Sequence, residues 1–339
     1  YNAGGGGYGG RGGRSNGCDT YGSLTEPLDL GSGGGHDGSS YGGQGGGLIH
    51  LAVDGVLQND GIITANGYNG GTSDAGGGSG GSIYILTNTL AGVGTISVNG
   101  GSGLSDGGGG AGGRIAVYYE TDTFTGQFTA YGGPGNQYGG AGTVYTKAPD
   151  QTYGTLLIDN QSNSGQSTQL TPGTYIFDEI DLSNEGLLYI PADANVVMVP
   201  DVLTLSDNAQ LLVEGGLYAG TEGNSAFTEI HVDSGSELTL GSDYAISSPL
   251  VEVASGASVV LQDSSVLTCD QLQFTDGTFT LNDNSSLVVQ SYLLDFSGSL
   301  YLNDEALLDV GNIGILSGCV FTQNTSLELQ SLRNYYGGI

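Results

Sequence analysis

The chain has 339 residues, of which 66 are glycine, and its 35 acidic residues against five basic ones give a formal net charge of −30. Such an acidic surface repels nucleic acids and anionic membranes, so we expect no nucleic-acid partner. No apolar run reaches the length of about 18 residues that a transmembrane helix needs, so we expect no membrane insertion. Because 48 glycines precede residue 151, we predict two sections, 1–150 and 151–332, followed by a tail over 333–339.

The first section contains a repeat. Residues 1–46 consist largely of glycine runs, a composition that is also typical of a disordered linker. In the next hundred residues, short apolar runs recur from Gly47, Gly81, Gly113 and Gly142, spaced 34, 32 and 29 residues apart. Such a regular spacing is typical of a solenoid built from similar rungs.

A second series of apolar runs follows the first in phase, beginning at Gly61, Gly94, Gly126 and Gly154. Between the pairs of runs lie glycine-rich stretches over 67–81, 100–113 and 132–142. Because glycine has no Cβ, these stretches can stack with their backbones in close contact, as layered polyproline-II-like chains. We predict this ordered stacking; the alternative is three disordered surface loops.

The order of these motifs is similar to that of a known class of repeats. The segment GGSIYILTNTLAGVGTISVNGGSG, followed by GGGGAGGRIAVYY, FTAYGG and GGAGTVYTK, resembles the glycine-rich β-solenoid repeats of very large secreted and cell-surface proteins, mainly bacterial and many of them adhesin-like. The resemblance covers residues 67–160. It implies an extracellular structural or adhesive role and supplies no catalytic residue.

The second section repeats at a shorter spacing. Blocks that begin at Leu250, Gln271, Leu293 and Ile313 are about 21 residues apart, and looser copies extend upstream to residue 177. Each block holds three short apolar runs separated by Asp, Asn, Gly and Ser, a pattern of strands and turns. We therefore predict an all-β fold, a parallel β-helix with three-sided rungs, preceded by the glycine-rich solenoid section. Stacking of neighbouring rungs would stabilise it.

The turns between these runs are rich in oxygen ligands. Calcium prefers carboxylate and carbonyl oxygens, so the candidate ligands are Asp207, Asp283, Asp304 and Glu305. Neither an EF-hand loop nor a calcium-roll repeat is present, and the alternative is diffuse counter-ions. We expect no other cofactor.

Other surface residues are open to two interpretations. The three N-x-[ST] sequons at Asn160, Asn284 and Asn324 are either glycan acceptors in a eukaryotic secretory pathway or ordinary corner residues. Tyrosines such as Tyr118 and Tyr119 could stack on sugars or on another subunit, or cover the glycine layers.

The sequence contains few residues that favour a catalytic role. A polysaccharide lyase of this fold class relies on a basic residue, and no Lys or Arg lies between Lys147 and Arg333. Paired carboxylates such as Asp304 and Glu305 would serve hydrolysis, but they occupy turn positions. His36, His50 and His231 are scattered without metal-ligand spacing. We expect that the protein is not an enzyme.

Self-assembly is the function that we expect. A β-helix has open strand edges at its ends, and neither 1–10 nor 331–339 has the pattern of an amphipathic cap. We therefore predict an extracellular structural protein that stacks end to end as the subunit of a filament or surface fibre. The candidate contact residues are Arg11, Arg14, Arg333, Tyr335 and Tyr336. One alternative is an adhesin-like module that contacts glycans or a neighbouring cell, and a less favoured one is a polysaccharide-active enzyme.

Overall fold

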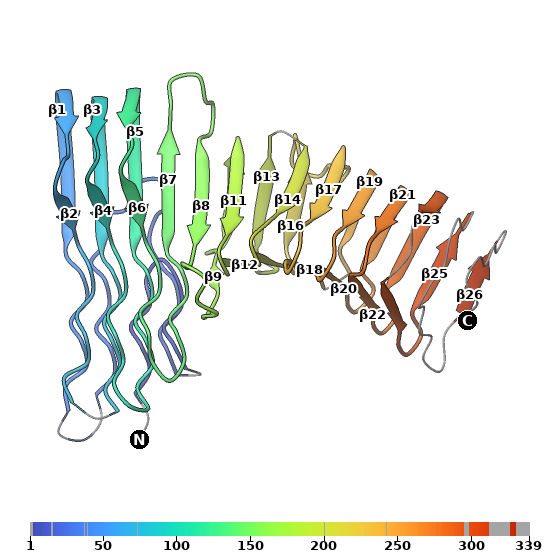
Figure 1. Cartoon of the computed structure of the whole chain (residues 1–339), viewed down its shortest axis with the longest axis horizontal. Coiled ribbons are helices and arrows are strands. Elements are labelled where there is room, and N and C mark those ends of the chain that lie inside the picture. Colours follow the sequence, from blue (N-terminus) through green and yellow to red (C-terminus); the bar gives the residue numbers. More distant parts are fainter. Residues whose placement is uncertain are drawn as a thin grey trace. The chain divides into compact units, whose positions relative to one another are not determined.

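The computed structural model describes residues 3–14, 16–36, 38, 40–72, 74–199, 201–241, 243–294, 298–311 and 326–329. In these ranges every regular element is a β-strand, and almost all strand pairs are parallel (Figure 1). The all-β prediction is confirmed. Within the same ranges there is no helix of the length and hydropathy needed to span a membrane. The chain divides into two compact units, Tyr1–Thr171 with Phe177–Leu188, and Pro172–Ile176 with Tyr189–Ile339.

Unit 1 contains two sheets, whose strands are mostly parallel. The larger sheet has the order β1 (Leu48–Gln58), β3 (Ser82–Gly92), β5 (Arg114–Phe124), β7 (Thr143–Lys147), β8 (Thr155–Asp159) and β11 (Glu179–Ser183). The smaller sheet has the order β2 (Ile62–Thr64), β4 (Thr95–Ser97) and β6 (Gln127–Thr129). A short strand, β9 (Thr168–Gln169), lies near the end of the unit.

The register of the larger sheet follows the sequence repeat. Leu48 pairs with Ser82, Ser82 with Arg114, and Arg114 with Thr143. These steps are the spacings of 34, 32 and 29 residues in the sequence, so the predicted repeat is confirmed. The side chains between the two sheets form one apolar core, which includes Ile83, Ile85, Leu90, Ile96, Ile115 and Val117.

One predicted strand has a different position. The run from Gly154 was expected to extend the second series, but it forms β8, which pairs antiparallel with β7 and parallel with β11. This prediction is wrong because the connection after β7 folds back as a hairpin, in which the Tyr145 hydroxyl donates to the carbonyl of Tyr153 at 2.7 Å. The smaller sheet therefore ends at β6, beside a cavity of about 270 Å³ lined by Phe128, Tyr131 and Leu157 among others.

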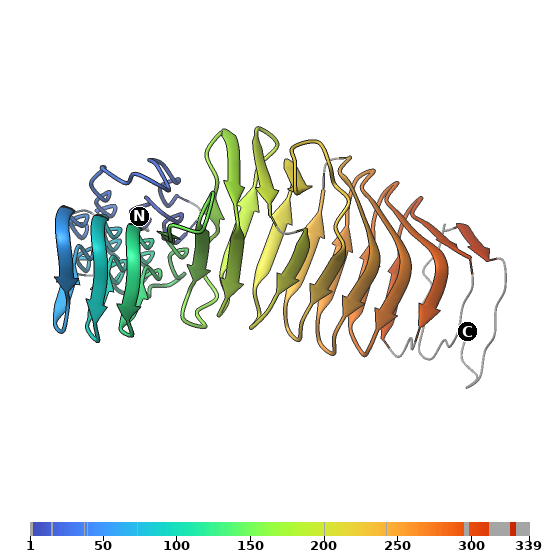
Figure 2. The same cartoon turned by 90° about the horizontal axis from the view of Figure 1, so that it is seen from above.

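The glycine-rich stretches form a layer held together by backbone hydrogen bonds, visible as small coils beside β1, β3 and β5 in Figure 2. Within one stretch, successive N–H groups donate to three neighbouring segments in turn. The bonds run from Gly76 to Gly35, Gly77 to Gly108, Gly78 to Tyr68, Ser79 to Ser32, Gly80 to Ala111, and Gly81 to Ala65. A period of three residues is that of a polyproline-II helix. The predicted ordered stacking is thus confirmed.

Glycine is required in this layer because the backbones leave no room for a side chain. A Cβ added to Gly110 would lie 2.0 Å from the carbonyl oxygen of Gly78, and one added to Gly77 would lie 2.0 Å from that of Gly101. Both contacts are far below van der Waals separation and involve backbone atoms. The high glycine content of this layer is therefore a packing requirement rather than a sign of disorder.

Unit 2 contains shorter strands. One sheet includes β15 (Gln210–Val213), β18 (Glu237–Leu240), β20 (Ser258–Leu261), β22 (Thr278–Leu281) and β24 (Ser299–Leu302). Another has the order β14 (Val202–Leu205), β17 (Glu229–Val232), β19 (Ala245–Val253), β21 (Val266–Phe274), β23 (Ser286–Leu294), β25 (Leu307–Val310) and β26 (Ser326–Leu329). A third pairs β13 (Ala194–Met198) with β16 (Gly216–Ala219). Two further strands, β10 (Gly173–Phe177) and β12 (Leu187–Ile190), span the division between the units in the sequence.

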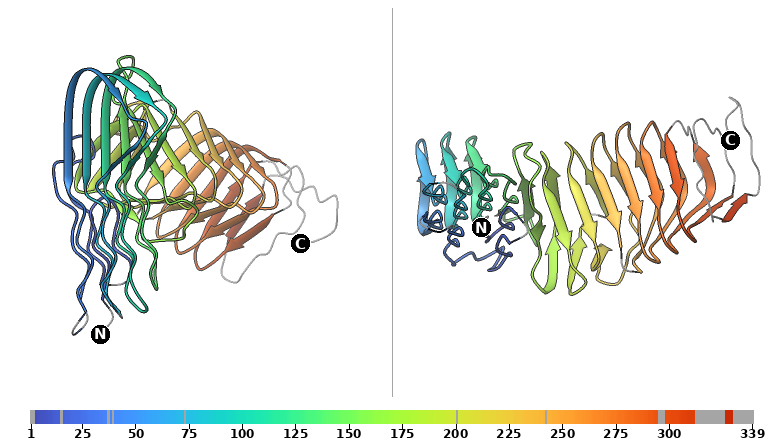
Figure 3. Two further views of the ribbon diagram at one scale, coloured as in Figure 1. Left: turned by 60° about the vertical axis from the view of Figure 1, so that its left-hand side comes forward. Right: turned by 90° about the horizontal axis from the view of Figure 1, so that it is seen from below.

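The register in unit 2 gives columns of buried side chains, and successive strands lie side by side (Figure 3). Leu238 pairs with Val259, Val259 with Phe279, and Phe279 with Leu300. The steps are 20 or 21 residues, so the predicted spacing of about 21 is confirmed. All four side chains are buried, because alternate residues of each strand point to the same face.

Candidate functional site

The first notable feature of unit 1 is an open end of its core. β1 and β2 are edge strands of the two sheets. The inward side chains of Ile49 and Leu51 are partly exposed, whereas their register partners Ile83 and Ile85 are 0% exposed. Val56 and Ile62 on the same strands alternate with the core-facing Leu57 and Ile63, so they lie on the outer faces, where they are 60% and 74% exposed. The apolar core therefore reaches solvent at β1 and β2, although a register shift after Val53 interrupts the regular edge of β1.

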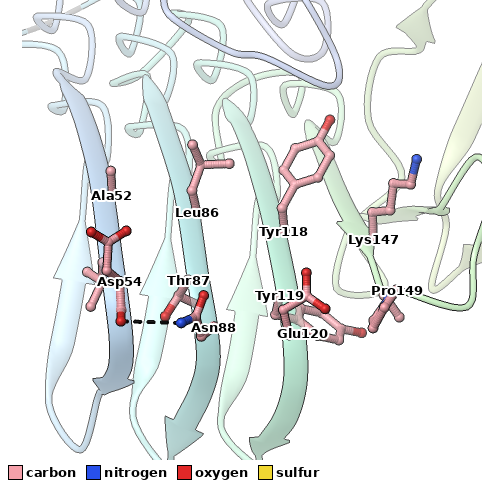
Figure 4. A pocket seen from close by; sticks show the side chains of 12 residues that line it. Ala52, Asp54, Leu86, Thr87, Asn88, Tyr118, Tyr119, Glu120, Lys147 and Pro149 are labelled. Atoms are coloured by element: carbon pink, nitrogen blue, oxygen red, sulfur yellow. Dashed lines mark hydrogen bonds between the residues drawn. The ribbon is translucent and has the colours of Figure 1, made fainter.

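The second feature is a shallow groove of about 360 Å³ on the outer face of β1, β3, β5 and β7 (Figure 4). Its lining includes one row of the sheet, because Ala52 pairs with Leu86, Leu86 with Tyr118, and Tyr118 with Lys147. Two residues further along the strands, a second row of side chains is polar: Asp54, Asn88 and Glu120. The groove thus has an apolar side and a hydrogen-bonding side.

Several contacts hold the aromatic member of the groove in place. The Tyr118 hydroxyl donates to the carbonyl of Thr25 at 3.2 Å. Its ring lies 5.9 Å from the ring of Tyr84, nearly edge-on, and 5.7 Å from that of Tyr145. Burial raises the pKa of both Tyr118 and Tyr145, so both hydroxyls stay protonated at neutral pH. At the end of the row, the Lys147 ammonium donates to the carbonyl of Thr152 at 2.7 Å.

The sequence analysis predicted that Tyr118 and Tyr119 could stack on sugars, and both residues line the groove. It did not predict the polar row beside them. A signal was present, because Asp54, Asn88 and Glu120 are spaced 34 and 32 residues apart. These are the steps of the sheet register. Polar residues that recur with the period of a repeat occupy one line on its surface.

The calcium candidates occupy two different corners. Asp283, Asp304 and Glu305 lie in turns that stack, since Leu281 pairs with Leu302 before the turns and Ser286 with Leu307 after them. Asp207 follows β14 and belongs to the other corner. All four side chains are exposed. Among the residues that the structure describes, no group of three or more His, Cys, Asp or Glu could hold a metal ion.

The sequons differ in accessibility. The Asn160 side chain is 1% exposed; its Oδ1 accepts the N–H of Gly132 at 2.8 Å, and its Nδ2 donates to the carbonyl of Asn163 at 2.6 Å. Asn160 is therefore not a glycan acceptor in the folded chain, because its amide is enclosed and bonded. Asn284 is exposed in a turn, and Asn324 lies outside the described residues.

The candidate contact residues near the N-terminus lie within the glycine layer. Arg11 forms an ion pair with Asp19 at 3.0 Å, and the backbone N–H of Arg14 donates to the Gln137 side chain at 2.9 Å. The candidates Arg333, Tyr335 and Tyr336 lie outside the described residues. Two cysteines are described: Cys18 is exposed and Cys269 is buried.

A cluster on unit 2 combines one imidazole with two carboxylates. His231 Nδ1 lies 2.7 Å from Glu252 Oε2, and its Nε2 lies 2.9 Å from Glu229 Oε2. His231 faces outward, as its alternation with the buried Ile230 and Val232 predicts. We interpret the cluster as a surface ion-pair group, because both glutamates are well exposed.

Comparisons with known proteins give no functional assignment: no protein-family model, curated protein or solved structure matches this chain.

Proposed function

We propose that this chain is an extracellular structural protein, the subunit of a filament or surface fibre. Its strands would form the three-sided rungs of a parallel β-helix, with the glycine layer as one side of the larger rungs. Three observations support this architecture: parallel pairing, register steps that equal the sequence repeats, and buried columns that continue from strand to strand. Stacked repeats of this kind suit a structural role.

The open end of the core at β1 and β2 carries the proposal. Burial of an aliphatic side chain such as Val56 or Ile62 is worth about 1.5–3 kcal/mol, and both are largely exposed. A long exposed edge with apolar side chains is a template for pairing with another chain. A second copy that pairs with this edge would cover the partly exposed, core-facing Ile49 and Leu51, and would place its own side chains beside Val56 and Ile62 on the outer faces. A contact between unlike surfaces that does not close produces a fibre.

Negative-stain electron microscopy and sedimentation at rising protein concentration test this proposal. We expect the native chain to form fibres or larger oligomers, and the Val56→Lys/Ile62→Lys variant to stay monomeric because charge opposes edge pairing. The matched control is Leu104→Lys/Tyr153→Lys. It adds the same two positive charges, but at two exposed side chains that lie outside β1 and β2. Monomers of native protein at every concentration, or assembly by the edge variant, would contradict the proposal. Repeating the series with calcium and with a chelator tests the corner carboxylates.

A further inference from the structure

We propose that the groove across β1, β3, β5 and β7 is a binding site for a linear, neutral polysaccharide. The proposal concerns a different surface from the open edge, because the groove lies on the outer face of the sheet (Figure 4). It therefore stands or fails independently of fibre formation.

The groove suits an extended ligand. It crosses four neighbouring strands, which corresponds to three strand spacings or about 14 Å. Its volume of about 360 Å³ lies at the lower end of the range for small-molecule sites. A shallow groove that is open along its length accepts a segment of a chain, so the ligand need not end within it.

The apolar row provides a surface for the C–H groups of a sugar ring. Leu86 and Tyr118 are neighbours in this row. Tyr118 is fixed by the hydrogen bond from its hydroxyl to Thr25 and by its contacts with Tyr84 and Tyr145. A ring that is already held in position loses little conformational entropy when a ligand packs against it. Aromatic side chains of this kind combine a large apolar area with a fixed geometry.

The polar row provides partners for hydroxyl groups. The carboxylates of Asp54 and Glu120 accept hydrogen bonds, and the amide of Asn88 both donates and accepts. Asn88 is oriented by the bond from its Nδ2 to the backbone carbonyl of Asp54 at 3.2 Å. Because this row lies beside the apolar row, a ligand with hydroxyls at its edge and C–H groups on its face satisfies both. Saccharides have this arrangement.

The charges of the site favour a neutral ligand. An anionic polysaccharide would approach two carboxylates on a chain of net charge −30. A linear cation such as a polyamine would meet Lys147, the one lysine of the chain, at the end of the row. A neutral saccharide can accept hydrogen bonds from Lys147 and Asn88 and donate to Asp54 and Glu120. It is therefore the class of ligand that can form hydrogen bonds with all four of these groups.

Isothermal titration calorimetry with cellotetraose, maltotetraose and xylotetraose tests the site, with tetragalacturonate and spermidine as charged probes. We expect at least one neutral tetrasaccharide to bind. The Asp54→Asn/Glu120→Gln variant should weaken that binding by about tenfold or more, since each lost hydrogen bond to a charged group costs about 1.5–3 kcal/mol. The matched control is Asp283→Asn/Asp304→Asn, which makes the same charge change on exposed turns of unit 2.

Several outcomes would overturn the proposal. These are no binding of any neutral probe to the native chain, equal binding by the groove variant, or an equal loss of binding in the control. Tighter binding of tetragalacturonate or spermidine would assign the groove to a charged ligand instead. Hydrogen exchange of residues 114–124 with and without the tetrasaccharide places a positive result on the groove, and circular dichroism verifies that each variant is folded.

Discussion

The glycine layer of unit 1 and the strands of unit 2 are stacked by different means. In unit 1 the glycine layer is held by backbone hydrogen bonds between segments that leave no space for a Cβ. In unit 2 the strands are stacked over columns of apolar side chains, such as Leu238, Val259, Phe279 and Leu300. One unit therefore depends on the absence of side chains in its layer and the other on their presence.

This difference shows that similar repeats can be destabilised by opposite changes in side-chain size. Alanine is too large for the glycine layer, where backbone atoms meet directly, and too small for the columns of unit 2, where it leaves a cavity. The same substituent should thus destabilise both units for opposite reasons. Because the chain has two compact units, local measurements such as hydrogen exchange are more informative than one global unfolding transition.

The largest effect is expected for Phe279→Ala. The Phe279 side chain is 0% exposed, and its ring lies 5.9 Å from that of Phe274. Truncation of a buried Phe typically costs about 3–5 kcal/mol, because apolar contacts are lost and a cavity remains. We expect faster hydrogen exchange across β20, β22 and β24 but not in the glycine layer. Phe279→Leu is the control, with a cost of about 1 kcal/mol, and equal exchange in both variants would contradict the cavity explanation.

A smaller but still large effect is expected for Gly110→Ala. The added Cβ would lie 2.0 Å from the carbonyl oxygen of Gly78 and 2.4 Å from its carbon, so the backbone has to move. Overpacking of this kind costs about 1–3 kcal/mol or more. Hydrogen exchange should increase in the glycine-rich segments alone.

The matched control for the glycine layer is Gly47→Ala. No heavy atom lies within 4 Å of a Cβ at Gly47, so the substitution should change the free energy of unfolding by about 0.5 kcal/mol or less. If Gly110→Ala were as harmless as Gly47→Ala, close backbone packing would not be the reason for the glycines. The contrast between the two units would then fail.

The smallest effect is expected for His231→Gln, on the outer face of unit 2. Burial alone lowers the pKa of His231, but its hydrogen bonds with Glu229 and Glu252 outweigh burial and raise the pKa above the ordinary value of 6.5. The charged imidazole therefore stabilises the fold below about pH 6.5, and this contribution is lost as the pH rises through the folded pKa. The two glutamates are well exposed. We therefore expect the charged imidazole to contribute only about 0.5 kcal/mol to the free energy of unfolding.

Urea unfolding of native and His231→Gln protein at about pH 5.5 and pH 8.5 checks this pH dependence. The variant should be less stable at the lower pH and indistinguishable at the higher one. A difference that grows with pH would contradict the direction of the pKa shift. A difference of several kcal/mol would mean that outer-face ion pairs matter as much as the interior columns.

Much of the fold could be predicted from the sequence, because a repeat requires residues at equal phase to occupy equivalent positions. The spacings from Gly47 to Gly142 predicted the register of the larger sheet. The position of β8 could not be predicted in this way, since its apolar run fits the second series equally well. Pairing was decided by the hairpin after β7 and its bond from Tyr145 to Tyr153.

For the candidate site, too, some properties could be predicted from the sequence and others could not. By itself, the sequence determined which residues recur in phase, including the glycines, the apolar columns and the polar row of Asp54, Asn88 and Glu120. Only the tertiary structure decided accessibility: Asn160 is enclosed, Asn284 is exposed, and the core is open at β1. The physical reason is that periodicity fixes the phase of a residue within a repeat, whereas exposure depends on whether another segment packs over that phase.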